Sequence, residues 1–386
     1  MKSQNAVHIG LNAHLLSRRA SYRSAGIHSY ILHLIRHLPA IDTQMRFTVF
    51  AGHTRDTLED ASAKLRWRAS RWSTENPWVR ILWEQWVQPW DVHRAGIDLL
   101  HAMAFVTPVA ATAPVIVTVH DLSFMRFPER FRRLNRLYLS AMTRLSCKRA
   151  RRIIAVSQAT ADEIVSLLGI SPERIDVVPH GVDHKRFRPI APKQVMRLAQ
   201  KNRLPERFVL FLGTLEPRKN LTTLVEAFAQ TEALRQGVEL VIAGAKGWFY
   251  DEVFRCVEAL GLTQVVHFPG FVPDDELPLW YNATSVFVYP SIYEGFGMPL
   301  LEAMACGTPV VSSDASCIPE VVGDAGILVS PHDTGALANA MDRILADADW
   351  HTELSQRGRA RAAAFTWNAT ARSTAACYRR ALEKGE

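Results

Sequence analysis

The residue types best suited to chemistry gather in two short segments in the second half of this 386-residue chain. In the first segment, Arg218 and Lys219 follow an apolar run that ends in Gly213. They precede Asn220, a residue type that caps helices. Two adjacent cations beside a helix N-terminus can bind a diphosphate, because arginine supplies a planar fork of donors, lysine a point charge and the helix its free N–H groups. A pair of surface charges on a turn would give the same pattern.

The second segment, SIYEGFGMPLLEAMACGTPVV, begins at the end of another apolar run. A proline in the first turn and a glycine just past the end predict a helix over about 299–306. Glu294 lies in the preceding loop beside glycines, which let backbone amides approach a ligand closely. Glu302 lies within the helix, so one carboxylate can face a sugar while the other accepts hydrogen bonds from a ribose diol. Stabilisation of the helix dipole would explain Glu302 alone, but neither the glycines nor the second acid.

Apolar runs alternate with helical stretches along the whole chain, which predicts parallel sheets covered on both faces and therefore an α/β fold. The predicted strands of the first half are 6–13, 46–52, 98–104, 114–121, 152–157 and 174–181. Those of the second half are 207–214, 238–245, 265–271, 285–291 and 308–314. Ligands of such sheets bind beyond the carboxyl ends of the strands, which is where both charged segments lie.

The strand pattern restarts near residue 205, after a polar linker. A chain of this length is too long for one ordinary core, so two doubly wound domains are expected. We place the boundary within 188–205, with a first domain over 1–190 and a second over 191–368. The remaining residues, 369–386, belong to a predicted closing helix.

The composition is that of a globular protein, with 48% hydrophobic and 22% charged residues. The sequence contains no run of 18 uncharged apolar residues and no signal-peptide pattern, so we expect no membrane span and a cytoplasmic location. The five cysteines are scattered and lack C-x-x-C spacing. A disulfide framework or a zinc cluster is therefore not expected.

Positive charge is concentrated in the first half: residues 1–190 contain 27 Lys and Arg against 15 Asp and Glu. The densest stretch runs from Arg126 to Arg152, with ten basic residues and one acid. Its apolar residues recur at steps of three and four, which predicts an amphipathic helix. The basic face is either simply solvated or attracted to anionic lipid or a phosphate-bearing acceptor. No nucleic-acid-binding motif accompanies the charge, so we do not expect a nucleic-acid partner.

Tryptophans are concentrated in the same half, six of the ten lying within residues 67–90. Trp83, Trp86 and Trp90 are at helical spacing, and we expect them in the core. Trp67 and Trp72 are flanked by arginines, which suggests an interfacial or acceptor-binding patch.

Four motifs together resemble the retaining GT-B glycosyltransferases of family four, and the resemblance covers nearly the whole chain. They are V-T-V-H-D-L at 117–122, V-P-H-G-V-D at 178–183, L-G-T-L-E-P-R-K-N at 212–220 and E-G-F-G-M-P-L-L-E at 294–302. The resemblance implies two Rossmann-like domains facing across a cleft, the first binding the acceptor and the second a nucleotide-sugar. It also implies that the closing helix packs back on the first domain.

Roles in the second domain follow from this resemblance. Arg218 and Lys219 match the pair that binds the donor diphosphate and stabilises the leaving nucleotide. Glu302 matches the acid that holds the ribose, and Glu294 the acid near the transferred sugar. The other donor-binding positions implied, mostly through backbone groups, are Gly213, Phe271, Val272, Phe296, Gly297 and Met298.

In the first domain, His120 ends a predicted strand and matches the family's active-site histidine close to the transferred sugar. Asp121 beside it can orient the loop. Gly26 occupies the glycine-containing first loop, which opens toward phosphate and acceptor. Many members have two adjacent glycines there and this chain has Ala25 before Gly26, which weakens the expected phosphate contact.

The resemblance implies retention of anomeric configuration, with the leaving diphosphate assisting deprotonation of the acceptor on the same face. A double displacement would require a carboxylate under the anomeric carbon, and we do not favour Glu294 in that role. The one Asp-x-Asp sequence, at 347–349, does not follow a strand. No metal or other cofactor is therefore expected, with Arg218 and Lys219 in place of the cation.

Two further segments, 244–254 with Trp248 and WEQWVQPW at 83–90, resemble bacterial mannosyltransferases of polysaccharide or O-antigen assembly. The expected donor is GDP-mannose, with a UDP-hexose as the main alternative. The expected acceptor is a saccharide, lipid-linked and reached at the inner face of the membrane.

Other classes remain open. A nucleotide-sugar epimerase would use the donor site without an acceptor, and a non-catalytic module would bind nucleotide and transfer nothing. An RNA-binding protein would explain the charge but not the glycine loops. The lysine-threonine-glycine-glycine motif of starch and glycogen synthases is absent, which argues against extension of a polymer from ADP-glucose.

Overall fold

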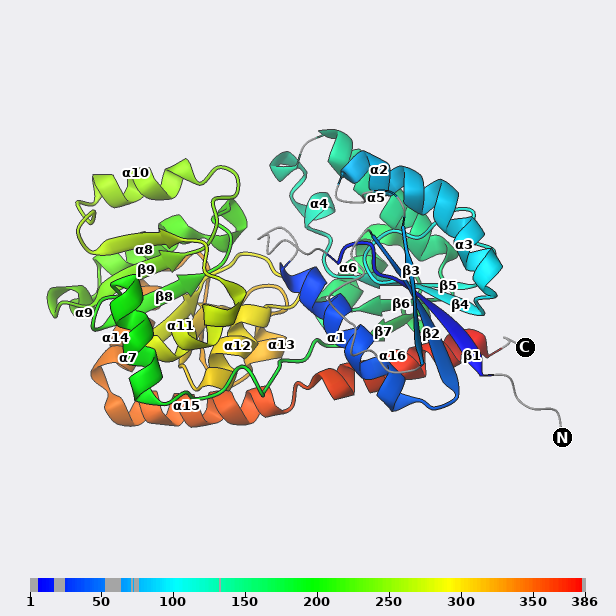
Figure 1. Cartoon of the computed structure of the whole chain (residues 1–386). Helices are drawn as coiled ribbons and strands as arrows, with labels where there is room; N and C mark the ends of the chain where they lie inside the picture. Colours follow the sequence, from blue (N-terminus) through cyan, green and yellow to red (C-terminus); the bar gives the residue numbers. More distant parts are fainter. Residues whose placement is uncertain are drawn as a thin grey trace. The chain divides into compact units, whose positions relative to one another are not determined.

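The computed structural model describes residues 6–16, 25–52, 64–70, 72, 76–131 and 133–383 (Figure 1). The chain divides into two compact units, Met1–Gly181 with Trp367–Glu386, and Val182–Thr366. The division falls earlier than the predicted 190/191, because residues 182–190 contact the second unit. There, Val182 forms a β-bridge with Thr366, and the ring of Phe187 packs edge-on against Tyr281.

Within the described residues, the first unit contains a seven-stranded parallel sheet in the order β3-β2-β1-β4-β5-β6-β7. Its strands are β1 (Val7–Asn12), β2 (Met45–Ala51), β3 (Leu65–Ala69), β4 (Leu99–Ala102), β5 (Val115–Val119), β6 (Arg152–Ala155) and β7 (Ile175–Val177). Strand β3 was not predicted. It is an edge strand in which exposed arginines flank Trp67, so it contains no continuous apolar run.

Helices pack on this sheet, and the last of them is the C-terminal helix of the chain. They are α1 (Ala25–Ile41), α2 (Pro77–Leu82), the π-helix η1 (Trp83–Val87), α3 (Gln88–Ala95), α4 (Ser123–Arg126), η2 (Pro128–Arg130), α5 (Arg133–Arg149), α6 (Gln158–Leu168), η3 (Pro172–Arg174) and the C-terminal α16 (Trp367–Leu382). Helix α16 packs against α1, where the indole of Trp367 stacks on His33 with ring centroids 4.6 Å apart. On β4, His101 shares a 2.7 Å hydrogen bond with the Tyr378 hydroxyl of α16.

The second unit contains a six-stranded parallel sheet, in the order β10-β9-β8-β11-β12-β13. Its strands are β8 (Phe208–Leu212), β9 (Glu239–Ala243), β10 (Val266–Gly270), β11 (Val286–Tyr289), β12 (Val310–Ser313) and β13 (Ile327–Val329). Strand β13 was not predicted, since three residues are too few to show a pattern. All the other strands of the two sheets were predicted, and the structure confirms them. The predicted α/β fold class is confirmed as well.

The helices of the second unit alternate with these strands. They are α7 (Pro192–Asn202), η4 (Pro217–Lys219), α8 (Leu221–Ala229), α9 (Glu232–Arg235), α10 (Asp251–Ala259), η5 (Asp274–Glu276), α11 (Leu277–Ala283), α12 (Met298–Cys306), α13 (Ile318–Val322), α14 (Thr334–Ala346) and α15 (Ala348–Ala363). The helix predicted over 299–306 is α12. It ends, as expected, at Gly307 in the left-handed conformation.

The prediction that Trp83, Trp86 and Trp90 lie together in the core is wrong for two of the three. Trp83 is buried, whereas Trp86 and Trp90 are 74% and 66% exposed. The cause is the π-helix that starts at Trp83, since a π-turn takes one residue more than an α-turn to close. Residues after it are rotated relative to those before it, so the spacing rule of a regular α-helix no longer applies.

Candidate active site

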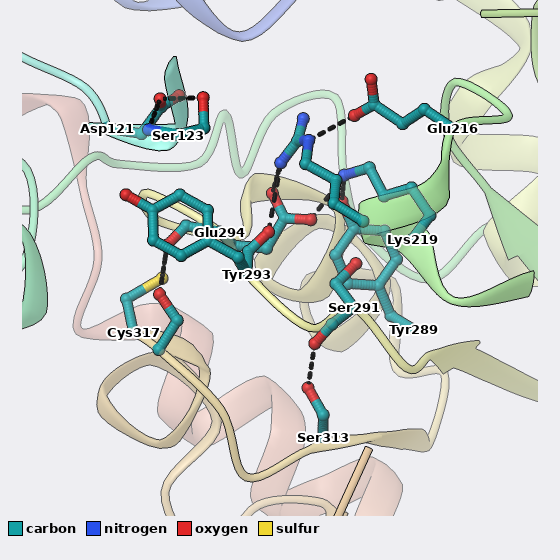
Figure 2. Close-up of polar contacts among 12 residues, drawn as sticks. Asp121, Ser123, Glu216, Lys219, Tyr289, Ser291, Tyr293, Glu294, Ser313 and Cys317 are labelled. Atoms are coloured by element: carbon teal, nitrogen blue, oxygen red, sulfur yellow. Dashed lines mark hydrogen bonds and ion pairs between the residues drawn. The ribbon is translucent and has the colours of Figure 1, made fainter. Parts of the chain in front are cut away.

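The charged residues of the second unit lie at the switch point of its sheet. The chain enters at β8, builds β9 and β10 to one side, and then crosses to β11 on the other. Arg218 and Lys219 follow β8 and Glu294 follows β11, so the parallel pairing of these strands brings all three to the same sheet edge. Figure 2 shows Lys219 and Glu294 next to each other. Open α/β sheets bind their ligands at such a point.

The carboxylate of Glu294 is held between both cations. Its Oε2 accepts a 2.9 Å hydrogen bond from Nη1 of Arg218, and its Oε1 accepts a 2.5 Å bond from Nζ of Lys219. The Arg218 guanidinium also donates to the carboxylate of Glu216, and Lys219 to the hydroxyl of Tyr289. Lys219 is buried, whereas the Arg218 side chain is partly exposed, so the guanidinium can reach a ligand.

Burial and charge compete at these groups. Burial would raise the pKa of Glu294, but Arg218 and Lys219 outweigh it and hold that pKa at about 2. Burial and the neighbouring Arg218 lower the pKa of Lys219, against the opposing effect of Glu294. The cations and the carboxylate depend on one another for their charged forms.

The loop that presents Glu294 is anchored by the segment after β12. The backbone carbonyl of Glu294 accepts hydrogen bonds from the hydroxyl of Ser316, at 2.6 Å, and the thiol of Cys317, at 3.2 Å. The Ser313 hydroxyl donates to the carbonyl of Ser291 at 2.5 Å (Figure 2). Sequence reasoning missed these supports, because they come from a segment about twenty residues further along the chain.

Sequence reasoning also missed Glu216 and Tyr289 as partners of the cations. Glu216 is part of the motif at 212–220, and Tyr289 ends β11. An acid two residues before adjacent Arg218 and Lys219 is a signal that the sequence itself shows. The contact of Tyr289 with Lys219 is not, since it depends on the pairing of β8 with β11.

Asn220 differs from the expected N-cap. It precedes α8 but adopts the left-handed conformation, with φ of 58°, and its side chain makes no capping bond. Instead, its amide donates to the carbonyl of Pro331 at 2.6 Å and accepts from the Thr223 hydroxyl at 2.8 Å. The side chain therefore ties the η4–α8 turn to the segment after β13.

The start of α12 carries the predicted loop amides. Gly297 has φ of 90° at the N-cap, a conformation that favours glycine, and Met298 is the first helical residue. Phe296 is buried, with its ring against Phe365 at 6.1 Å. The first N–H groups of a helix have no partner within that helix, so this turn suits an anionic or hydroxyl-rich ligand.

Glu302 lies further along α12 and points to α11. Its Oε2 accepts a 2.9 Å hydrogen bond from the Tyr281 hydroxyl. Burial raises the pKa of Glu302 to about 7, against the opposing effect of that bond. Glu302 contacts neither cation in the hydrogen bonds of the described residues, so the two acids belong to separate hydrogen-bond networks.

The remaining second-unit positions lie where β8, β9 and β10 end. The amide of Gly213 donates to Ala243 at 3.0 Å, and the carbonyl of Gly270 accepts from Gly244 at 2.7 Å. The two residues after β10 differ in exposure, Phe271 being 48% exposed and Val272 buried. An exposed aromatic ring at a sheet edge suits contact with a flat ligand such as a base.

In the first unit, His120 directly follows β5 and is buried. Its Nε2 lies 2.9 Å from the carbonyl of Met103, so Nε2 carries the proton and Nδ1 is the acceptor. Burial lowers the pKa of His120 to about 4, which makes the ring neutral at physiological pH. Asp121 accepts hydrogen bonds from the amide and hydroxyl of Ser123, at 2.9 and 2.6 Å, and so orients the following turn (Figure 2).

Gly26 is the second residue of α1 rather than part of a loop. It is exposed, and a Cβ added there would meet nothing within 4 Å. The preceding segment of the predicted first loop, 17–24, lies outside the described residues.

Two α/β units are each built on a parallel sheet, and one of them has a pair of cations at the switch point of its sheet. These features define a Rossmann-type ligand-binding protein. Comparison with known proteins narrows this class. The family model of the glycosyl transferases group 1 matches residues 194–361, and that of glycosyltransferase family 4 matches residues 24–186. The O-antigen chain mannosyltransferase B of Escherichia coli is 35% identical over 294 residues, covering 76% of this chain and 77% of that protein.

The serotype-specific mannosyltransferase WbdA of Escherichia coli is 31% identical over 279 residues, which is 70% of this chain but only 34% of that longer protein. Among solved structures, sucrose-phosphate synthase from Thermosynechococcus elongatus gives a TM-score of 0.73 at 24% identity, covering 97% of this chain and 98% of that one. The chain therefore belongs to the group 1 glycosyl transferases of family four and is a GT-B glycosyltransferase. None of the helices in the described residues is long and apolar enough to cross a membrane.

Proposed function

We propose that this glycosyltransferase moves mannose from GDP-mannose to a lipid-linked saccharide acceptor, with retention of configuration and without a metal ion, in the synthesis of a cell-surface polysaccharide. The observation that carries the proposal is the Arg218–Lys219–Glu294 cluster at the switch point of the second sheet. The mannosyltransferase relatives support the choice of sugar.

The paired cations account for binding of the donor diphosphate. Arg218, partly exposed, can form two parallel hydrogen bonds with a phosphate, and Lys219 adds a charge in a desolvated position. As the bond between the anomeric carbon and the phosphate oxygen breaks, negative charge develops on that oxygen. Two fixed cations stabilise this charge, which is the contribution that a metal ion makes in other transferases.

The proposed transfer is a displacement on one face of the sugar. The acceptor hydroxyl oxygen bonds to the anomeric carbon, the bond to the diphosphate breaks, and the hydroxyl proton passes to the leaving diphosphate oxygen. Glu294 already balances two cations and has a low pKa, so it accepts hydrogen bonds from sugar hydroxyls rather than a proton. Neutral His120 contributes Nδ1 as an acceptor for a sugar hydroxyl.

Glu302 and the start of α12 complete the proposed donor site. The Glu302 carboxylate accepts hydrogen bonds from the ribose diol, and the amides of Gly297 and Met298 bind phosphate or sugar oxygens. The acceptor, attached to a lipid, is reached by peripheral contact with the cytoplasmic face of the plasma membrane. The excess of basic residues in 1–190 supports this contact with an anionic surface.

A thermal-shift screen tests the donor assignment. The protein and its Arg218→Ala variant are each melted with GDP, UDP, ADP, dTDP and their sugar conjugates, since a ligand of the folded state raises the melting temperature. A shift confined to GDP and GDP-mannose, and lost in the variant, supports both the donor and the diphosphate site. A shift with UDP compounds alone would replace mannose with a UDP-hexose, and a shift with no nucleotide would contradict the proposal.

A further inference from the structure

The segment from Pro77 to Ala95 carries a row of exposed apolar side chains. Elements α2, η1 and α3 follow one another without a break in the helical backbone, which ends at Gly96 in the left-handed conformation (Figure 1). At every fourth position a large apolar residue faces solvent. These residues, which we call the tryptophan stripe, are Trp78, Leu82, Trp86 and Trp90, exposed by 67%, 52%, 74% and 66%.

The π-turn explains why residues spaced four apart stay on one side of this helical segment. In a regular α-helix, four residues turn by about 400°, so such a row drifts around the axis by about 40° at each step. A π-turn needs more residues to close and so turns less per residue. Placed at Trp83–Val87, in the middle of the stripe, it offsets the drift of the flanking α-turns.

The opposite face of the segment is firmly anchored, so the stripe is not exposed by loose packing. Trp83 and Glu84 are buried, and the Glu84 carboxylate accepts a 3.0 Å hydrogen bond from the amide of Asn12 on β1. The Gln85 side chain donates to the carbonyl of Thr107 and accepts from the amide of Val109, at 3.3 and 2.9 Å. The molecule therefore holds three tryptophans and a leucine in water on a fixed element.

The surroundings of the stripe are basic. Arg66, Arg68 and Arg94 are exposed, and Nη1 of Arg68 donates to the backbone carbonyl of Asp91 at 3.3 Å, which places β3 beside α3. Helix α5 contains no acid and five basic residues, and its Leu134 and Leu137 are also exposed. It belongs to the same packed region, because the amide of Thr107 donates to its Ser146 hydroxyl at 2.9 Å.

We infer that the tryptophan stripe docks the first unit onto an anionic lipid bilayer. Tryptophan prefers the interface between lipid and water, where its ring meets apolar chains and its N–H meets headgroups, and arginines alongside it attract anionic lipid. A second protein copy would leave the arginines facing like charges, and a polysaccharide would stack poorly on Leu82. The inference deepens the proposed function, on whose lipid-linked acceptor it rests.

The test uses the full-length protein and sedimentation with vesicles of phosphatidylcholine, with and without phosphatidylglycerol. We expect binding that requires phosphatidylglycerol and weakens with salt. The variant Trp78→Ala/Trp86→Ala/Trp90→Ala should bind at least about ten-fold more weakly, since each ring buries a large apolar area in the interface. The control is Met196→Ala, which removes an exposed apolar side chain from α7 in the second unit and should bind unchanged.

Two outcomes would overturn the docking surface: no binding of the unchanged protein to anionic vesicles, or equally tight binding of the triple variant. A smaller assembly of the triple variant in size-exclusion chromatography, without loss of vesicle binding, would instead assign the stripe to a contact between copies. Nucleotide-induced thermal shifts of all variants are measured in parallel. If the triple variant loses vesicle binding but keeps its nucleotide-induced thermal shifts, the result supports the tryptophan stripe as the docking surface. If no variant and not even the unchanged protein shows a thermal shift, the proposed function is contradicted, and the vesicle result still decides whether the stripe binds lipid.

Discussion

At the scale of single residues, the site depends on a carboxylate whose charge balances two cations. Glu294 keeps its negative charge although it is buried, because Arg218 and Lys219 both bond to it. In the proposed function, the donor diphosphate competes for the same two cations. We expect Glu294 to hold the cations in place before the donor binds and to contact the sugar afterwards.

Replacing the charge of Glu294 should cost both stability and rate. In Glu294→Gln, buried Lys219 and partly exposed Arg218 lose a balancing charge, and we expect a loss of about 3–5 kcal/mol in the free energy of unfolding at neutral pH. We also expect transfer to fall by about a hundred-fold or more. Urea unfolding and an initial-rate assay measure the two effects. Glu226→Gln, exposed on α8, is the control and should change neither.

The same residue predicts a pH dependence. The pKa of Glu294 is about 2 in the folded protein and 4.5 in its ordinary state, so its stabilising contribution is complete above 4.5 and is lost as the pH falls toward 2. Unfolding free energies measured through this range should decline less steeply for Glu294→Gln than for the unchanged protein. Equal slopes would show that Glu294 is not held ionised by its partners.

His120 should contribute by hydrogen bonding rather than by proton transfer. Its pKa of about 4 means that it does not titrate near neutrality. We therefore expect the pH profile of kcat around 6.5, the usual histidine pKa, to have the same shape in the unchanged protein and in His120→Asn. We expect His120→Asn to lower kcat by at least about ten-fold while nucleotide-induced thermal shifts persist. His93→Ala, which removes an exposed histidine from α3, is the control.

At the scale of elements, α11 and α12 together set the protonation of the proposed ribose contact. Tyr281 on α11 donates to Glu302 on α12, whose pKa is about 7. An ionised carboxylate accepts hydrogen bonds from both ribose hydroxyls, whereas the protonated form accepts less well. GDP affinity, measured by calorimetry, should therefore rise as the pH increases through 7, and Glu302→Gln should abolish the rise. A variant that keeps the full pH dependence would remove Glu302 from the ribose site.

The ends of β8 and β9 meet so closely that only glycine fits. A Cβ on Gly244 would lie 1.8 Å from the carbonyl oxygen of Gly213, and φ of 147° there is itself unfavourable for other residues. We expect Gly244→Ala to lower the free energy of unfolding by about 3 kcal/mol or more, since backbone atoms must move. The matched control is Gly26→Ala, which meets open space. Its stability in chemical denaturation should not fall, because alanine favours a helix more than glycine does. Any loss of transfer would therefore report a role for Gly26 in binding.

At the scale of the whole molecule, the C-terminal helix belongs to the first unit although the second unit precedes it in the chain. Trp367 is buried against His33 and lies 5.9 Å from the ring of His180, which in turn neighbours His120 at 5.6 Å. The packing of α16 therefore supports the region around the proposed catalytic histidine.

The loss of stability caused by removing this packing should be confined to the first unit. We expect Trp367→Ala to destabilise the first unit by about 3–5 kcal/mol, because a large buried ring is removed. Calorimetry should show a lower transition for this unit, while GDP continues to raise the transition of the second. Arg372→Ala, exposed on α16, serves as the control. A variant in which both transitions fall together would mean that the units unfold as one.

The sequence indicated the fold and most of the candidate site, because both depend on local signals. Continuous apolar runs mark buried parallel strands, and residues at their carboxyl ends must share a sheet edge, which is how Arg218, Lys219 and Glu294 could be grouped. The motifs at 212–220 and 294–302 added the family, which the comparisons confirm. Helix α12 was predicted to within one residue, because proline and glycine mark its ends.

Only the tertiary structure decided how these residues are charged and which faces are buried. Lys219 donates to the hydroxyl of Tyr289 on the neighbouring strand, and Tyr281 donates to Glu302 on the neighbouring helix. The thiol of Cys317 donates to the backbone carbonyl of Glu294. Such contacts leave no periodic signal in one sequence. No spacing rule predicts the π-turn at Trp83–Val87 from the sequence either. Because of this turn, Trp86 and Trp90 lie in the exposed stripe and not in the core where we expected them. Local propensity determines where strands and helices form, whereas pKa values and burial depend on groups that the folded chain brings together from distant positions.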